Sequence, residues 1–256
     1  MENSKYYIDN TGKIRTFFKS IRYGDYLDIS TYSSGIVLKS STTPKGFRHK
    51  YLDPDGIRFL EYQKRKVRRV QEKIIQLIEC NFTRKSVFVT LTYAESDVDI
   101  TNLKITNFHF EKFIVSIREY FPNIKYICVP EFQLRGAVHY HILFSEPFID
   151  SDILKDCWKY GRSHVEKVYF KRGMAFYFVK YINKQHFDPR FFGKRTMFCS
   201  TKLVKPTVTY GVSESDKLDY FRDQGIKPVS TSVYSNDHLG IVIRKKFFSP
   251  LHDKIL

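Results

Sequence analysis

The sequence predicts an α+β fold, in which helices pack on a central antiparallel sheet. Two apolar stretches, at 124–132 and 137–144, are separated by a four-residue linker that contains Gly136, a pattern typical of a β-hairpin. An earlier segment at 86–93, SVFVTLTY, alternates in character and is rich in β-branched and aromatic residues, which indicates another strand. Apolar residues at three- and four-residue spacing before and after these segments indicate helices.

The predicted helices and the last strand follow from local patterns. Residues 57–80 repeat apolar side chains along one face and are predicted to form an amphipathic helix. A helix is predicted at 107–121, with Asn107 as its N-cap. The remaining elements are a helix at 150–160, a strand at 163–170 and a helix at 173–185. Residues 86–185 thus read strand, helix, strand, strand, helix, strand, helix, and the helices are expected on one side of the sheet.

The chain of 256 residues is expected to hold one core with two extensions. The core is predicted at 86–185, preceded by a basic N-terminal extension at 1–85 that carries the first helix. A C-terminal extension at 186–256 is expected to be irregular and of unknown architecture. The first 54 residues lack a sustained period, so irregular structure with a short strand near 35–39 is expected there. Two short strands are expected in the C-terminal extension, at 206–210 and 240–244.

Composition points to a nucleic-acid partner. The formal net charge is +16, and aromatic residues make up 16% of the chain. The charge lies in the flanks, which carry +9 over 1–85 and +5 over 186–256, against +2 in the core. Positive fields attract polyanions, and aromatic rings stack on unpaired bases. No apolar run is long enough to cross a membrane or to serve as a signal peptide, and the four cysteines lack metal or disulfide spacing, so we expect a cytoplasmic protein with reduced thiols and no membrane partner.

The polar face of the helix at 57–80 is a candidate DNA-binding surface. A solvated helix face would show the same charge run, but the net charge of the chain favours DNA contact. Arg135, in the hairpin linker, joins these candidate contacts. The basic residues on the helix face are Lys64, Arg65, Arg68, Arg69 and Lys73.

Two histidines in the hairpin form a candidate metal site. His139 and His141 project to the same face of their strand, about 7 Å apart at their Cα atoms. If the turn centres on Arg135, Glu131 lies opposite His139 in the neighbouring strand and adds a carboxylate. Two imidazoles and a carboxylate suit a divalent ion such as Mg²⁺ or Mn²⁺ and leave positions open for a substrate. The alternative is that the histidines face solvent or satisfy hydrogen bonds in the core.

Two tyrosines in the last predicted helix are candidate nucleophiles. Tyr177 and Tyr181 lie one turn apart on one face, and Lys180 and Lys184 are stacked beside them in the same way. A phenol is a poor nucleophile at neutral pH, so it needs an activated electrophile, and a nearby ammonium group helps to hold negative charge. Core packing is the alternative role for aromatic residues at this spacing.

Three segments together resemble the HUH endonuclease superfamily, specifically the two-tyrosine replication initiators of single-stranded DNA phages of the microvirus type and of rolling-circle replicons. The strand FVTLTY at 88–93 resembles the first motif, His139-Tyr140-His141 the metal motif and residues 177–184 the nucleophile motif. Their order and spacing also match. Glu131 stands where many members carry a third metal ligand, and the cysteine cluster of some phage members is missing.

The resemblance implies a nuclease core of the HUH type and a DNA nickase and strand transferase. A metal ion bound by Glu131, His139 and His141 would polarise the scissile phosphate of an origin in single-stranded DNA. Tyr177 or Tyr181 would then attack phosphorus, giving a 5′-phosphotyrosine and a free 3′-OH for a host DNA polymerase. No nucleotide-binding loop of the GxxxxGK[ST] type occurs, so strand separation would need a host helicase, in a bacterial cytoplasm if a phage encodes the chain. The alternatives are a non-catalytic protein that binds single-stranded nucleic acid and an HUH transposase or plasmid relaxase.

Overall fold

A computed structural model describes most of the chain and divides it into two compact units. The described residues are 7–8, 14–38, 57–94, 99–168, 175, 177–182, 188–192, 194–211, 213–236 and 238–249. One unit comprises 51–204, and the other joins 1–50 to 205–256. The structure therefore groups the two ends of the chain together, whereas the sequence suggested separate extensions.

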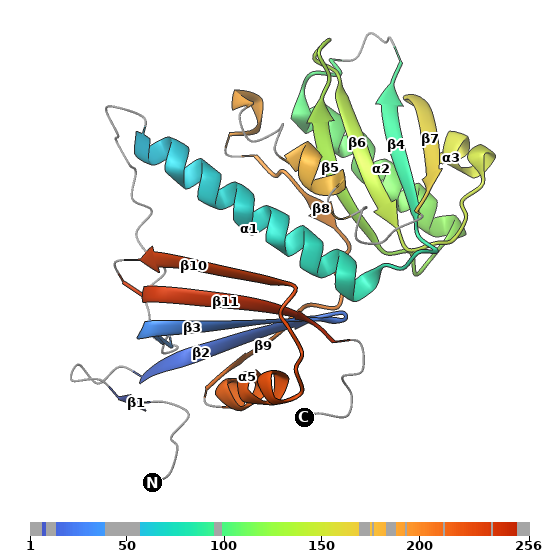
Figure 1. Cartoon of the computed structure of the whole chain (residues 1–256). Helices are drawn as coiled ribbons and strands as arrows, with labels where there is room; N and C mark the ends of the chain where they lie inside the picture. The colour runs from blue at the N-terminus through green and yellow to red at the C-terminus, as the bar shows by residue number, and fades with distance from the viewer. Residues whose placement is uncertain are drawn as a thin grey trace. The chain divides into compact units, whose positions relative to one another are not determined.

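The unit at 51–204 contains a five-stranded antiparallel sheet (Figure 1). Its strand order is β7-β4-β6-β5-β8, and the predicted hairpin is the pair β5 and β6. The α+β class and the antiparallel sheet are thus confirmed. The edge strand β8 lies beyond the predicted core. The strands are β4 (Val87–Tyr93), β5 (Tyr126–Phe132), β6 (Val138–Phe144), β7 (Gly161–Lys167) and β8 (Phe198–Cys199).

Helices cover both faces of this sheet, and the prediction of helices on one side is wrong. On one face, α2 (Leu103–Tyr120) and α3 (Ser151–Cys157) bury an apolar cluster against alternate residues of β4 and β6. On the other face, α1 (Ile57–Asn81) and the helical residues 177–182 pack on Phe88 and Leu143. The physical reason lies in β4, where Phe88 is as fully buried as its neighbours. A strand with apolar residues on both faces needs a cover on each.

The start of α2 also differs from the prediction. Asn102 is the N-cap, and its side chain accepts a hydrogen bond from the backbone N–H of Lys104 at 3.0 Å. Asn107 lies inside the helix, where its side-chain oxygen accepts a hydrogen bond from the hydroxyl of Tyr140 at 2.8 Å. The second asparagine therefore anchors the helix to the sheet instead of capping it.

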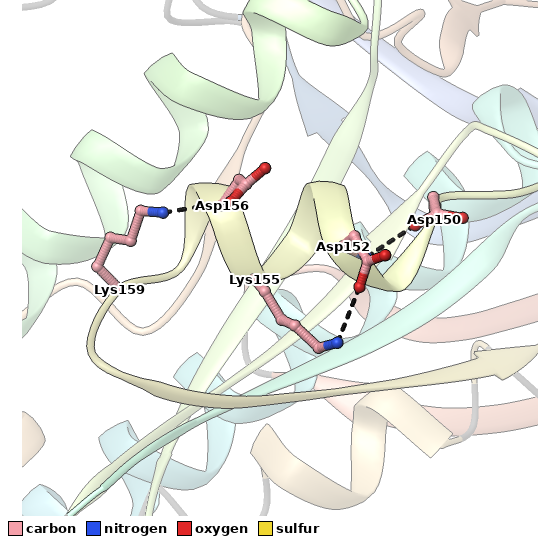
Figure 2. A network of polar contacts seen from close by, with 5 residues as sticks. All are labelled: Asp150, Asp152, Lys155, Asp156 and Lys159. Atoms are coloured by element: carbon pink, nitrogen blue, oxygen red, sulfur yellow. Dashed lines mark hydrogen bonds and ion pairs between the residues drawn. The ribbon is translucent and has the colours of Figure 1, made fainter.

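Local polar contacts fix α3 (Figure 2). Asp150 precedes the helix, and its side chain accepts a hydrogen bond from the backbone N–H of Asp152 at 2.7 Å. Lys155 pairs with Asp152 at 2.8 Å, and Lys159 pairs with Asp156 at 3.4 Å. Because these groups are exposed, the ion pairs contribute little to stability, and the cap is the main local stabiliser.

The second unit is a six-stranded antiparallel sheet with one described helix against it. The strand order is β1-β2-β3-β11-β10, and β9 pairs with β2. Leu27 and Ile29 of β3 and Phe247 of β11 pack on Phe221 of α5. The elements are β1 (Tyr7–Ile8), β2 (Ile14–Tyr23), β3 (Tyr26–Val37), β9 (Thr207–Tyr210), α5 (Ser213–Asp223), β10 (Ser230–Asn236) and β11 (Gly240–Phe248).

This sheet corrects the expectation of irregular structure at both ends of the chain. The N-terminal segment forms the long strands β2 and β3, joined at a turn where Gly24 has a positive φ of 52°. The C-terminal segment contains the two expected strands, β9 and β11, together with β10 and α5. The pairing of β3 with β11 supplies the order that neither segment shows alone. Among the described helices, none combines the length and the apolar character needed to span a membrane.

Candidate functional site

The hairpin has the register that the sequence predicted. Glu131 lies opposite His139, and Val129 lies opposite His141. The carboxylate and both imidazoles therefore share one face of the sheet. This is the face that carries α1 and residues 177–182.

His141 is held by a partner on each side of its ring. Its Nε2 lies 2.9 Å from Oε2 of Glu131, and its Nδ1 lies 3.3 Å from the hydroxyl oxygen of Thr90. Thr90 belongs to β4, where it is in register with His141. The sequence analysis missed Thr90, because the pairing of β4 with β6 was not predicted. A hydroxyl on one imidazole nitrogen fixes the ring and leaves the other nitrogen for a carboxylate or a metal.

His139 carries a buried nitrogen without a hydrogen-bond partner. Its Nε2 is buried, and no donor or acceptor reaches it among the described residues. Burial lowers the pKa of His139 to about 4, and the neighbouring His141 contributes to this decrease, so the ring is neutral at physiological pH. A neutral imidazole with a buried, unpartnered nitrogen has the chemistry of a metal ligand.

The three predicted ligands do not form a ready metal cluster in the observed arrangement. Within the described part of the chain, no set of three His, Cys, Asp or Glu side chains is arranged to hold a metal ion. The ring centres of His139 and His141 are 6.0 Å apart, and the Glu131 carboxylate is hydrogen-bonded to His141. The donor set nevertheless suits a divalent ion, since two imidazoles and a carboxylate are common ligands and Nε2 of His139 has no partner among the residues that the structure describes.

Both candidate nucleophiles lie against this face. The ring of Tyr181 stacks on that of His141, with 3.6 Å between the ring centres and 19° between the planes. Tyr177 contacts Tyr181 edge-on at 5.0 Å and lies 5.0 Å from the ring of Phe88. Burial raises the pKa of Tyr181 well above its ordinary value, and a hydrogen bond with Tyr177 and the charge of Glu131 raise it further. The Tyr181 phenol therefore keeps its proton in this arrangement.

The other predicted site residues lie at varied distances from this cluster. Lys180 is exposed on its helix, and Lys184 lies outside the described residues. Arg135 donates to the backbone carbonyl of Tyr93 at 2.7 Å and to the side chain of Gln133 at 3.0 Å. The basic side chains of α1 are exposed as predicted, at Lys64, Arg65, Arg68, Arg69 and Lys73.

The fold and the site define an α+β protein whose sheet carries a carboxylate and two histidines next to two tyrosines of a helix. Residues 86–186 match the model of a family of replication-associated proteins, the ORF2 type. This match supports a replication-associated protein of the rolling-circle initiator kind, and its bounds nearly coincide with the predicted core. Searches of curated proteins and of solved structures found no match.

Proposed function

We propose that the chain initiates rolling-circle DNA replication as a metal-dependent endonuclease of the HUH type. The observation that carries the proposal is the contact between the two candidate groups, in which the Tyr181 ring stacks on His141 at 3.6 Å. The match of residues 86–186 to replication-associated proteins supports the same function. The candidate ligands and nucleophiles thus lie within the segment that matches.

In this mechanism, Glu131, His139 and His141 hold a divalent ion such as Mg²⁺ or Mn²⁺. When bound, such an ion supplies charge that polarises the scissile phosphate. Tyr177 or Tyr181 attacks phosphorus, so an Oη–P bond forms while the P–O3′ bond breaks. The phenol proton is lost, and the departing O3′ takes up a proton to become a free hydroxyl. The products are a 5′-phosphotyrosine and a 3′-OH that primes a host DNA polymerase.

Two adjacent phenols suit two successive cleavages. Tyr177 and Tyr181 are in edge contact at 5.0 Å, so both lie close to the same ligands. After one round of synthesis, the second tyrosine cuts the regenerated origin. The released 3′-OH then attacks the first phosphotyrosine and closes a circle. Rejoining needs no nucleotide, because the phosphotyrosine bond conserves the energy of the cut bond.

The proposal is tested by trapping the covalent adduct. The protein is incubated with Mn²⁺ and labelled single-stranded oligonucleotides that cover candidate origins, and the products are separated on a denaturing gel. We expect a labelled band at the size of protein plus DNA that depends on the metal. Absence of such a band over all candidate origins would reject the nuclease.

Tyrosine variants assign the nucleophile. Tyr177→Phe and Tyr181→Phe should each leave some adduct, whereas the double variant should form none. The exposed Tyr120 on α2 provides a matched control, and Tyr120→Phe should leave the adduct unchanged. Full adduct formation by the double variant would exclude this helix as the source of the nucleophile.

A histidine variant assigns the metal ligand. His139→Ala should abolish cleavage and keep salt-sensitive DNA binding, because the phosphate contacts lie elsewhere. His164 on β7 is exposed and ion-paired with Glu166, so His164→Ala is the matched control. Metal-dependent cleavage that survives in His139→Ala would show that this histidine is not a ligand.

A non-catalytic protein that binds single-stranded nucleic acid is the second candidate. One observation favours it, namely that the described residues hold no ready set of three metal ligands. Under this alternative, the basic face of α1 binds DNA while Glu131 and His141 form a structural hydrogen bond. The adduct assay separates the two, since the binding protein would retain oligonucleotides without forming a covalent bond.

A further inference from the structure

A cavity adjoins the candidate metal ligands at the turn end of the hairpin. Its volume is about 600 Å³, within the range of small-ligand sites. Glu131 and His139 form part of its wall, so a molecule in the cavity would lie beside the site of the proposed phosphate chemistry. The remaining lining residues are Phe132, Gln133, Leu134, Arg135, Asp188 and Phe191.

The walls of the cavity offer flat apolar surface in a fixed position. The Phe132 ring packs on Phe191 with 4.9 Å between ring centres, and the guanidinium of Arg190 lies 3.7 Å from the centre of the Phe132 ring. Leu134 adds a fully exposed apolar side chain at the turn. Nucleobases stack on aromatic rings and insert next to apolar side chains.

The charges in the cavity disfavour a phosphate as its occupant. The Arg190 guanidinium is hydrogen-bonded to both carboxylate oxygens of Asp188, at 2.9 Å and 2.5 Å, and this pairing lowers the pKa of Asp188. The guanidinium of Arg135 is engaged by Tyr93 and Gln133. A phosphate would therefore meet the carboxylates of Glu131 and Asp188, while the arginines described at this cavity are already engaged. A neutral flat group meets no such penalty.

Gln133 gives the cavity a polar group with a defined direction. Its side-chain oxygen accepts a hydrogen bond from Nε of Arg135, so its amide NH₂ remains as the donor. Backbone hydrogen bonds fix the residue, from its N–H to the carbonyl of Ala137 at 2.8 Å and from the N–H of Gly136 to its carbonyl at 2.9 Å. A donor held in this way pairs with an acceptor atom on the edge of a base, such as a thymine carbonyl.

We infer that this cavity binds a nucleobase of single-stranded DNA, read through an acceptor on its edge by the amide of Gln133. The inference rests on the proposed function, because the strand that enters the cavity is the one that passes Glu131 and His139. The cavity supplies base recognition, and the adjoining ligands supply the phosphate chemistry. The base bound here belongs to a nucleotide next to the scissile phosphate.

The test compares two ligands in EDTA, where no cleavage occurs. Fluorescence anisotropy measures the affinity for a labelled oligothymidylate and for an abasic oligonucleotide of equal length, which has the phosphates but no bases. The ratio of the two affinities isolates base recognition, because charge effects act on both ligands alike. In Gln133→Ala this ratio should fall about fivefold, as expected for the loss of one hydrogen bond.

Two further variants keep the result interpretable. Gln133→Glu retains an acceptor for Arg135, so the turn is preserved, but it lacks the amide donor, and the ratio should fall to the same extent. Gln224, exposed after α5 in the other unit, is the matched control, and Gln224→Ala should leave the ratio unchanged. An unchanged ratio in Gln133→Glu would overturn the inference.

The outcomes separate this inference from the proposed function. A reduced ratio in the Gln133 variants, without any covalent adduct in the wild type, would reject the nuclease and retain the base site. Adduct formation with an unchanged ratio would reject the base site alone. Photocrosslinking of an oligonucleotide that contains 5-bromodeoxyuridine adds a direct readout, with the crosslink expected on residues 132–135. Crosslinks found only outside this segment would also overturn the inference.

Discussion

Replacing Thr90 by valine tests whether the candidate metal site depends on β4. The Thr90 hydroxyl lies 3.3 Å from Nδ1 of His141, and valine keeps the shape of the side chain while removing the hydroxyl. The ring of His141 then loses the contact that fixes its orientation. Partners of this kind orient metal-binding histidines and raise their affinity for the metal. Thr90→Val should therefore weaken Mn²⁺ binding with little change in fold.

The magnitude follows from the geometry of the bond. A separation of 3.3 Å is longer than the usual separation of about 2.9–3.0 Å for a nitrogen–oxygen pair, so the bond is worth about 1 kcal/mol, in the middle of the ordinary range. At about 1.4 kcal/mol per tenfold, this loss corresponds to about a fivefold decrease in affinity. The change is large enough for calorimetry to resolve.

The same strand offers a matched control. Thr92 lies opposite His139, as Thr90 lies opposite His141, but the hydrogen bond to the facing histidine is described for Thr90 alone. Isothermal titration with Mn²⁺ should show about fivefold weaker binding for Thr90→Val and less than about a twofold change for Thr92→Val. Equal affinities in the two variants would refute the orienting role of Thr90, and no Mn²⁺ binding by the wild type would refute the metal site itself.

Three further predictions concern DNA binding, pH and packing. Arg68→Ala with Arg69→Ala should lower the slope of log affinity against log salt by about two in filter binding to single-stranded DNA, and an unchanged slope would exclude this face of α1 as a phosphate contact. Burial raises the pKa of Tyr126 to about 12, above its ordinary value of 10.0, so its contribution to stability is complete below pH 10 and is lost as the pH rises towards 12. Tyr126→Phe should therefore lose less stability than the wild type between about pH 9 and pH 11.5 in urea unfolding, and parallel losses would contradict the prediction. A Cβ at position 161 would lie 2.1 Å from the carbonyl oxygen of Thr92, so Gly161→Ala should destabilise the protein by more than about 3 kcal/mol, with equal midpoints in thermal unfolding as the contrary result.

The sequence was most informative where the pattern is local. The period of two in the hairpin, with Gly136 in its turn, was enough to place Glu131 opposite His139. The period of the helix at 57–80 was likewise enough to place its basic side chains in solvent. Alternation and helical spacing depend on neighbouring residues alone, so they can be read without knowledge of the fold.

The features that depend on distant partners could not be predicted. The stacking of Tyr181 on His141 requires the position of a helix relative to a sheet, and the bond of Thr90 to His141 requires the pairing of two strands that are far apart in sequence. The burial of Phe88 between two alternating neighbours could have indicated helices on both faces, since VFVTLTY has apolar residues in both phases. Strand β3 contains the polar run STYSSG, which gives no alternating signal before β11 pairs with it.

The pairing of β3 with β11 has a consequence for the order of folding during translation. Because the unit at 51–204 is inserted between these strands, a ribosome completes it while β3 still waits for its partner. The nascent chain therefore exposes a strand edge until the final segment emerges, and such edges are prone to pair with other chains. Premature termination after residue 204 would leave this edge permanently open, so shortened products should aggregate or be degraded while their inserted unit is already folded.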